Sequence, residues 1–166
     1  MTTDFKALTA DVHQHREEII ERMVNFSLTD ALLFRDGSEE LLLREKQIWD
    51  PILQWAKEEI RAEFKCSESL DVPEENNASL PLLQVFLDSL SDKELAAFYV
   101  AARNTKSVLL ASALVKGRIS GEEAFQAAYL PELWQAEKWG IDEEAENRRQ
   151  ELRAELLDVE NFIRQS

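Results

Sequence analysis

The side chains that could carry catalysis in this chain are few and far apart in the sequence. There is one cysteine, Cys66, and there are two histidines, His13 and His15. A cysteine nucleophile needs a neighbouring base, but both histidines belong to the polar side of a helical pattern. Side chains two residues apart leave a helix in different directions, so His13 and His15 cannot hold one metal ion from that helix. The pattern favours solvated histidines and a free thiol over a catalytic pair.

Other catalytic patterns give no stronger signal. Glu17, Glu18 and Glu21 lie close together, but no Glu-x-x-His pair of the kind that binds a di-iron centre follows them. The four glycines fall where helices are expected to begin or end, and none belongs to a glycine-rich phosphate loop. We therefore expect no catalytic residue, no metal ligand and no cofactor. An acid–base or metal enzyme stays open as an alternative to a protein that only binds a partner.

Two aromatic clusters are more specific. The first contains Trp49, Asp50 and Pro51, and the second covers residues 132–140 with two tryptophans, Trp134 and Trp139. Residues five apart fall on different faces of a helix. Tryptophan is enriched at binding hot spots, and spacing alone leaves core and interface open for both indoles of the second cluster. In the first cluster, an apolar Trp49 beside a helix cap is the simpler interpretation.

The segments around these clusters have the pattern of helices. Apolar residues recur at spacings of three, four and seven over residues 4–26, which is typical of an amphipathic helix. Because Pro51 has no N–H, we expect one helix to end before it and Asp50 to cap the next. The second cluster should form a short helix over residues 132–139 that Gly140 ends.

The most apolar segment, residues 105–115, predicts where the core lies. Almost all of its side chains are small or apolar, and a helix that is apolar on most faces is buried at the centre of a bundle. Capping boxes are expected on either side, at Ser91 with Glu94 and at Ser120 with Glu123. The pattern predicts an all-α fold, an orthogonal bundle of about seven or eight short helices around a buried central helix.

The composition fits a single domain over residues 1–166 in a reducing compartment. A lone cysteine cannot form an internal disulfide. The sequence shows no secretory signal, no transit peptide and no apolar run that could span a membrane. The net charge of -14 disfavours nucleic acid and anionic membrane surfaces. We expect a monomer that binds another protein and does not insert into a membrane.

The motifs, taken in order, resemble a known family. The run from Thr29 to Arg35, then Trp49-Asp50-Pro51, then the stretch from Trp134 to Gly140 are similar to the assembly chaperones of the ATP synthase catalytic head. The resemblance implies a non-enzymatic protein that binds the free alpha subunit. It would shield the surface that the beta subunit later covers and release the subunit into the hexamer. It implies the cytoplasm of a bacterium or, for a eukaryotic source, the mitochondrial matrix.

The resemblance also assigns partner-binding residues. The family keeps an acidic residue shortly before its Trp-Gln stretch, and Glu132 is the matching position here. Its neighbours depart from the usual acidic run. The resemblance implies that Glu132, Trp134, Gln135 and Trp139 contact the alpha subunit.

A structural motif is implied for Trp49, Asp50, Pro51 and Gly140. Family members usually carry a β-rich domain before the helical one, and we expect this chain to lack it. If the likeness to the family is coincidental, a generic acidic helical adaptor or regulatory module is the alternative.

Overall fold

The computed structural model describes residues 3–35 and 37–165, and helices account for most of them. Within these ranges nine α-helices and three 3-10 helices follow one another in the order α1 (Phe5–Gln14), α2 (Arg16–Phe26), η1 (Ser27–Thr29), η2 (Ala31–Leu33), α3 (Glu39–Glu59), η3 (Glu74–Ser79), α4 (Leu80–Asp88), α5 (Asp92–Thr105), α6 (Val108–Val115), α7 (Gly121–Ala128), α8 (Leu130–Trp139) and α9 (Glu143–Arg164). The β-bridge found in these ranges pairs Phe34 with Ser67. The predicted all-α fold is confirmed. No described helix is long and apolar enough to span a bilayer.

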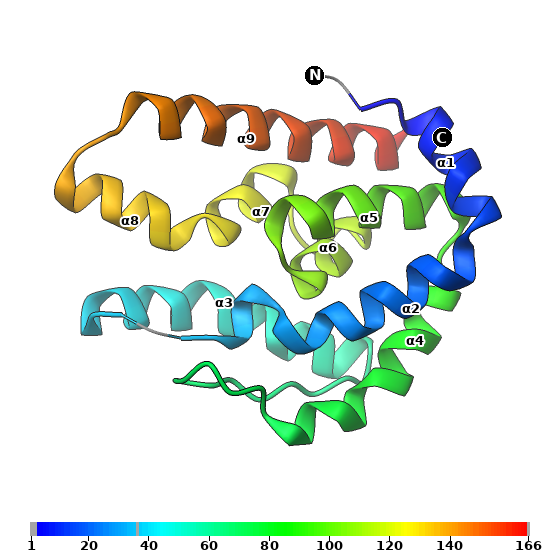
Figure 1. Cartoon of the computed structure of the whole chain (residues 1–166), viewed down its shortest axis with the longest axis horizontal. Helices are drawn as coiled ribbons and strands as arrows, with labels where there is room; N and C mark the ends of the chain where they lie inside the picture. Colours follow the sequence, from blue (N-terminus) through cyan, green and yellow to red (C-terminus); the bar gives the residue numbers. More distant parts are fainter. Residues whose placement is uncertain (1–2, 36, 166) are drawn as a thin grey trace.

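The helices are arranged around the hairpin of α5 and α6. In Figure 1, α9 runs along one side of this hairpin and α3 along the other, with α2 crossing in front of α3. Helices α1 and α4 lie at one end, and α8 extends toward the opposite end. Residues 4–26 were expected to form one helix. Instead the chain bends at His15, and α1 and α2 are separate. The described residues contain nine α-helices, one or two more than the expected seven or eight.

Helix α6 is the buried centre that its composition predicts. All eight of its residues are buried, and Leu109 and Leu110 have no exposed surface. It begins later than expected, because Thr105 still belongs to α5 and Lys106 turns the chain with a left-handed φ of 57°. Ser107 then caps α6, since its hydroxyl accepts a hydrogen bond from the Leu110 N–H at 3.0 Å. Both predicted capping boxes are present.

A buried carboxylate joins the start of α6 to the segment before α3. Asp30 has no exposed surface, and its two oxygens accept hydrogen bonds from the N–H groups of Leu32 and Leu109, each at 2.9 Å. The Ala31 N–H donates to the Lys106 carbonyl at 3.0 Å. Burial raises the pKa of Asp30 to about 6, although these hydrogen bonds act to lower it. The positive end of the α6 dipole favours the negative charge at this place.

Helix α3 corrects the expectation for Asp50 and Pro51. It is continuous from Glu39 to Glu59 with Pro51 inside it, so Asp50 is not an N-cap. The buried stripe of α3 continues from Trp49 to Ile52 across this point. Pro51 and Gln47, whose carbonyl loses its N–H partner, both lie on the exposed side. Packing of the buried stripe therefore outweighs the missing hydrogen bond.

The side chains beside Pro51 hold α3 in place. Asp50 forms an ion pair with Arg35 at 2.8 Å, and the Arg35 guanidinium lies 5.3 Å from the centre of the Trp49 ring. Trp49 is 3% exposed, and its indole N–H donates to the Ala127 carbonyl at the end of α7 at 2.8 Å. The structural role expected of Trp49 agrees with its burial. The pair of Asp50 with Arg35 is a role that the spacing did not suggest.

Truncation of the central helix tests the position of the core. Leu109→Ala and Leu110→Ala each remove a fully buried side chain, and we expect each to lower the free energy of unfolding by about 2–5 kcal/mol. Urea unfolding monitored by circular dichroism measures this. If both variants unfold at the wild-type midpoint, α6 is not the core helix.

Replacement of the proline tests the continuous α3. Pro51→Ala restores an N–H inside an intact helix, and we expect the free energy of unfolding to rise by roughly 1–2 kcal/mol, after allowing for the greater freedom of the unfolded chain. The same urea titration reports this change. A loss of stability would mean that the helix needs a proline-shaped joint at this position.

Titration of Asp30 tests the buried cap. The folded pKa of about 6 lies above the ordinary value of 3.8, so the folded state holds the proton more tightly. The stabilising contribution of this group is then complete below about pH 3.8 and is lost as the pH rises through about 6. Relative to Asp30→Asn, which does not titrate there, wild-type stability should fall by roughly 1–3 kcal/mol across this window. A difference that stays constant or rises would contradict the buried cap.

Candidate partner-binding site

Helices α8 and α9 form a hairpin whose turn stands away from the core. Pro131 lies in the first turn of α8, where a missing N–H costs little. Gly140 ends α8 with a φ of 99°, a backbone conformation that residues with a Cβ rarely adopt. Asp142 then caps α9 by accepting a hydrogen bond from the Glu144 N–H. The predicted end of α8 at Gly140 is confirmed, and α8 begins at Leu130, slightly earlier than expected.

Three of the four residues predicted to bind a partner line one groove. A hollow of about 390 Å³ lies between α8 and α9. From α8 and its turn it is lined by Glu132, Gln135, Ala136, Trp139 and Gly140, and from α9 by Asp142, Ala145 and Arg149. The structure therefore brings Glu132, Gln135 and Trp139 together on one surface.

The two tryptophans of α8 occupy different environments. Trp134 is partly buried and packs against the core, and its buried indole nitrogen has no hydrogen-bond partner among the described residues. Trp139 is 80% exposed, and Ile141 beside it is 69% exposed. Trp139 is therefore available to a partner, while Trp134 positions α8. An exposed tryptophan next to a second large apolar side chain is an uncommon surface feature.

Arg149 sets the electrostatics of the groove. Its side chain is only 6% exposed, and it forms ion pairs with Glu146 at 2.9 Å and Glu132 at 3.5 Å. A hydrogen bond from Gln150, which has the larger effect, and one from Arg149 both lower the pKa of Glu146. Glu132 remains largely exposed, so one side of its carboxylate faces the buried guanidinium and the rest faces solvent. Sequence reasoning missed Arg149, because nothing marks it among the many charged residues of α9.

Helix α3 braces the hairpin from the other side. Arg44 forms an ion pair with Glu137 at 2.8 Å, and Lys138 forms one with Glu40 at 3.1 Å. The hydrogen bond from Arg44 lowers the pKa of Glu137. Exposed ion pairs are each worth little, but these two bridges link the last turn of α8 to the first two turns of α3. They fix the direction of α8 and leave Trp139 at its end.

The arrangement suits binding and gives no support to a catalytic reaction. Partial burial raises the pKa of the Cys66 thiol, which opposes formation of a reactive thiolate. Among residues 3–35 and 37–165, no group of three or more His, Cys, Asp or Glu side chains is placed to hold a metal ion. The exposed apolar tip and the charged groove beside it are features of a protein-binding surface.

Comparison with known proteins identifies relatives of the fold. Residues 2–57 match the family model described as ATP12 chaperone protein. The crystal structure of Atp12 from Paracoccus denitrificans superposes with a TM-score of 0.86 at 28% identity, over 92% of this chain and 66% of that one. A mutant of the same Atp12p gives the same TM-score and identity, over 92% of this chain and 65% of that one.

A third solved structure extends the likeness. The Atu1473 protein from Agrobacterium tumefaciens is 33% identical with a TM-score of 0.80, and the match covers 92% of this chain and 57% of that one. The chain thus spans about two thirds or less of the length of these solved relatives. The family model and the solved structures agree: residues 2–57 match the ATP12 chaperone family, and the helical fold is similar to that of Atp12.

Proposed function

We propose that this chain is the helical part of an ATP synthase assembly chaperone and that it binds the free alpha subunit. The observation that carries the proposal is the α8–α9 tip, where Trp139 is 80% exposed beside the groove that Glu132 and Gln135 line. This surface lies on a fold that matches Atp12 at a TM-score of 0.86. Binding would take place in the bacterial cytoplasm or the mitochondrial matrix, and it involves no chemical step.

The geometry suits temporary capture of a folded subunit. An exposed indole can bury a large apolar area on contact, and Ile141 beside it extends that area. Glu132 offers a carboxylate to a donor on the alpha subunit, while Arg149 below it prevents the negative charge from standing alone. One aromatic anchor with a partly paired charge forms a small interface, and small interfaces are typical of transient encounters. Transient binding is what a chaperone needs in order to release its subunit.

Removal of the exposed indole tests this surface. We expect Trp139→Ala to reduce capture of the cognate alpha subunit at least tenfold, because truncation of a hot-spot tryptophan typically costs about 2 kcal/mol or more. The stability of the chain itself should change by no more than about 0.5 kcal/mol, since the side chain makes little internal contact. Co-purification of tagged chain with alpha subunit, quantified by biolayer interferometry, measures the loss.

Val85→Ala is the matched control for that experiment. Val85 is also an exposed apolar residue, at 68%, but it lies on α4. Equal capture by wild type, Trp139→Ala and Val85→Ala would remove the α8–α9 tip from the proposal. Failure of the wild-type chain to retain any alpha subunit would leave the generic adaptor as the better interpretation.

Charge reversal at Glu132 tests the polar half of the same surface. Glu132→Lys places a cation beside Arg149, and we expect it to weaken capture by about 2–5 kcal/mol, as loss of one side of an interfacial charge pair does. Glu146 still pairs with Arg149 at 2.9 Å, so the helical spectrum and melting temperature should stay close to wild type. Unchanged capture at matched helicity would limit Glu132 to its favourable place at the start of α8.

A further inference from the structure

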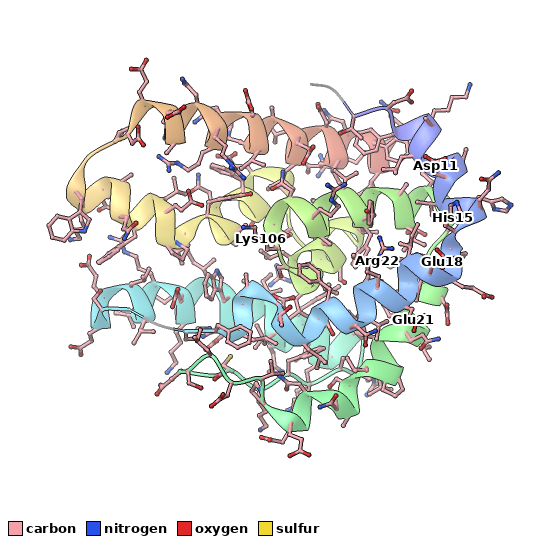
Figure 2. The ribbon with its side chains drawn as sticks, in the orientation of Figure 1. Asp11, His15, Glu18, Glu21, Arg22 and Lys106 are labelled. Atoms are coloured by element: carbon pink, nitrogen blue, oxygen red, sulfur yellow. The ribbon has the colours of Figure 1, made fainter. Side chains whose placement is uncertain are left out.

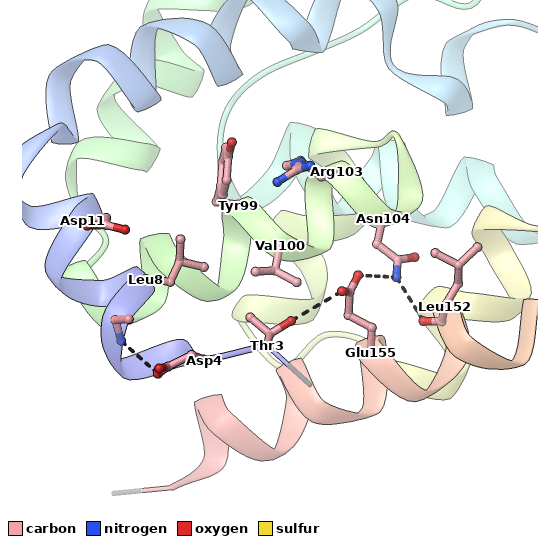
Figure 3. Close-up of a pocket in the computed structure, with 11 residues that line it drawn as sticks. Thr3, Asp4, Leu8, Asp11, Tyr99, Val100, Arg103, Asn104, Leu152 and Glu155 are labelled. Atoms are coloured by element: carbon pink, nitrogen blue, oxygen red, sulfur yellow. Dashed lines mark hydrogen bonds between the residues drawn. The ribbon is translucent and has the colours of Figure 1, made fainter. Parts of the chain in front are cut away.

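A second hollow, separate from the α8–α9 groove, lies between α2 and the exposed face of α5. Its volume is about 430 Å³, and it is lined by Arg22, Met23, Phe26, Tyr99, Arg103 and Lys106. Figure 2 shows Arg22 on α2 and Lys106 at the end of α5 on the same face of the molecule. In Figure 3, Tyr99 and Arg103 project side by side from α5. We call these six residues the α2–α5 hollow.

The charge of this hollow is opposite to that of the whole protein. The chain carries a net charge of -14, yet the three charged residues of the hollow are all cations. Six of the eleven arginines have carboxylate partners, such as Arg16 with Asp92 and Arg153 with Glu122. In contrast, within the described ranges Arg22, Arg103 and Lys106 form no ion pair. Three neighbouring cations without acidic partners leave a local positive potential.

The carboxylates nearest to the hollow do not neutralise it. A neighbouring cleft, which Tyr99 and Arg103 also line, contains Asp4, Asp11 and Glu155. None of these three carboxylates lies within 4.0 Å of the Arg103 guanidinium. Glu155 accepts hydrogen bonds from Asn104 at 2.8 Å and Thr3 at 3.5 Å, and Asp4 accepts one from the Ala7 N–H (Figure 3). On α2 itself, Glu18 and Glu21 are close to Arg22 in sequence, but neither lies within 4.0 Å of its guanidinium. The cations of the hollow therefore remain available.

The apolar lining decides what kind of anion fits. Phe26 and Tyr99 are half-buried and Met23 is buried, so the wall between the cations is aromatic and aliphatic. The Arg103 guanidinium lies 5.4 Å from the centre of the Tyr99 ring. The walls are the sides of helices whose backbone N–H groups are already paired, unlike a phosphate site, which is built from free backbone N–H groups. Long cationic side chains around an apolar wall suit carboxylates that flank an apolar side chain.

We propose that the α2–α5 hollow is a docking site for an acidic segment of a protein partner, in which an aromatic or aliphatic residue lies between Asp or Glu residues. The apolar side chain packs against Phe26, Tyr99 and Met23. The carboxylates on either side pair with Arg22, Arg103 and Lys106. This contact is a second point of recognition, distant from Trp139 and independent of the α8–α9 groove.

The fluorescein-labelled peptide Glu-Glu-Phe-Glu-Glu is the probe, and fluorescence anisotropy is the measurement. Because a chain of this net charge repels an acidic peptide, binding reports a local cationic site. We expect saturable binding that weakens from low ionic strength to about 0.15 M. Arg22→Gln combined with Arg103→Gln should weaken it at least tenfold. Trp139→Ala should leave it unchanged, which separates this site from the proposed alpha-subunit surface.

A matched control removes the same charge elsewhere. Lys46→Gln combined with Arg118→Gln changes the net charge equally at two exposed positions outside the hollow, and it should bind the peptide as wild type does. Equal weakening by both double variants would overturn the proposal, because it would mean that only overall charge matters. Equal binding of Glu-Glu-Ala-Glu-Glu would overturn the apolar contact. Displacement of the peptide by ATP at similar concentration would assign the hollow to nucleotides instead.

Discussion

The buried carboxylate of Asp30 is the contact on which the arrangement of the molecule depends. It fixes the start of α6 by accepting the N–H of Leu109, and it fixes the turn before α3 by accepting the N–H of Leu32. A buried carboxylate without such donors would be costly, because burial removes its charge from water and nothing replaces the lost hydrogen bonds. The helix dipole and the hydrogen bonds offset part of this cost, and they do so only in this geometry. The polar contact therefore selects the register in which α3 lies beside the core helix.

The same register places the candidate binding surface. Trp49 on α3 reaches the end of α7 through the Ala127 carbonyl, and Arg44 and Glu40 on α3 reach α8. Gly121 allows α7 to approach α9 closely, since a Cβ at this position would lie 2.7 Å from the Leu156 carbonyl oxygen. Contacts from α3 and from α7 thus hold the α8–α9 hairpin on two sides. Its tip, with Trp139 and Ile141, is left exposed, as the proposed capture and release of a partner would require.

Local signals in the sequence predicted most of the helices. The capping boxes at Ser91 and Ser120 satisfy the same orphan N–H groups in isolation as in the fold, so they could be read directly. The effect of Pro51 could not be predicted from the sequence, because it depends on whether tertiary packing outweighs a lost hydrogen bond. In α3, packing of the buried stripe outweighs it. The start of α6 was misplaced since only the left-handed turn at Lys106 separates two helices of similar composition.

The candidate site was predictable in part. Glu132, Gln135 and Trp139 share a surface because their spacing brings them to one side of α8, and the resemblance to the family had pointed to them. Trp134 could not be assigned to the core or to the surface from the sequence. The spacing shows that Trp134 and Trp139 point in different directions, but it does not show which of them faces the core. Arg149 and the cations of the α2–α5 hollow lie on helices that are far from their neighbours in the sequence. Their importance appears only when the fold shows which carboxylates are, or are not, near them.

Hydrogen–deuterium exchange of this chain with and without cognate alpha subunit tests the central claim most directly. The account predicts that residues 132–142, at the α8–α9 tip, become protected when the alpha subunit is added, while α6 is already protected in the free chain because it is the buried core. Protection confined to helices away from this tip, or no change anywhere on mixing, would contradict it.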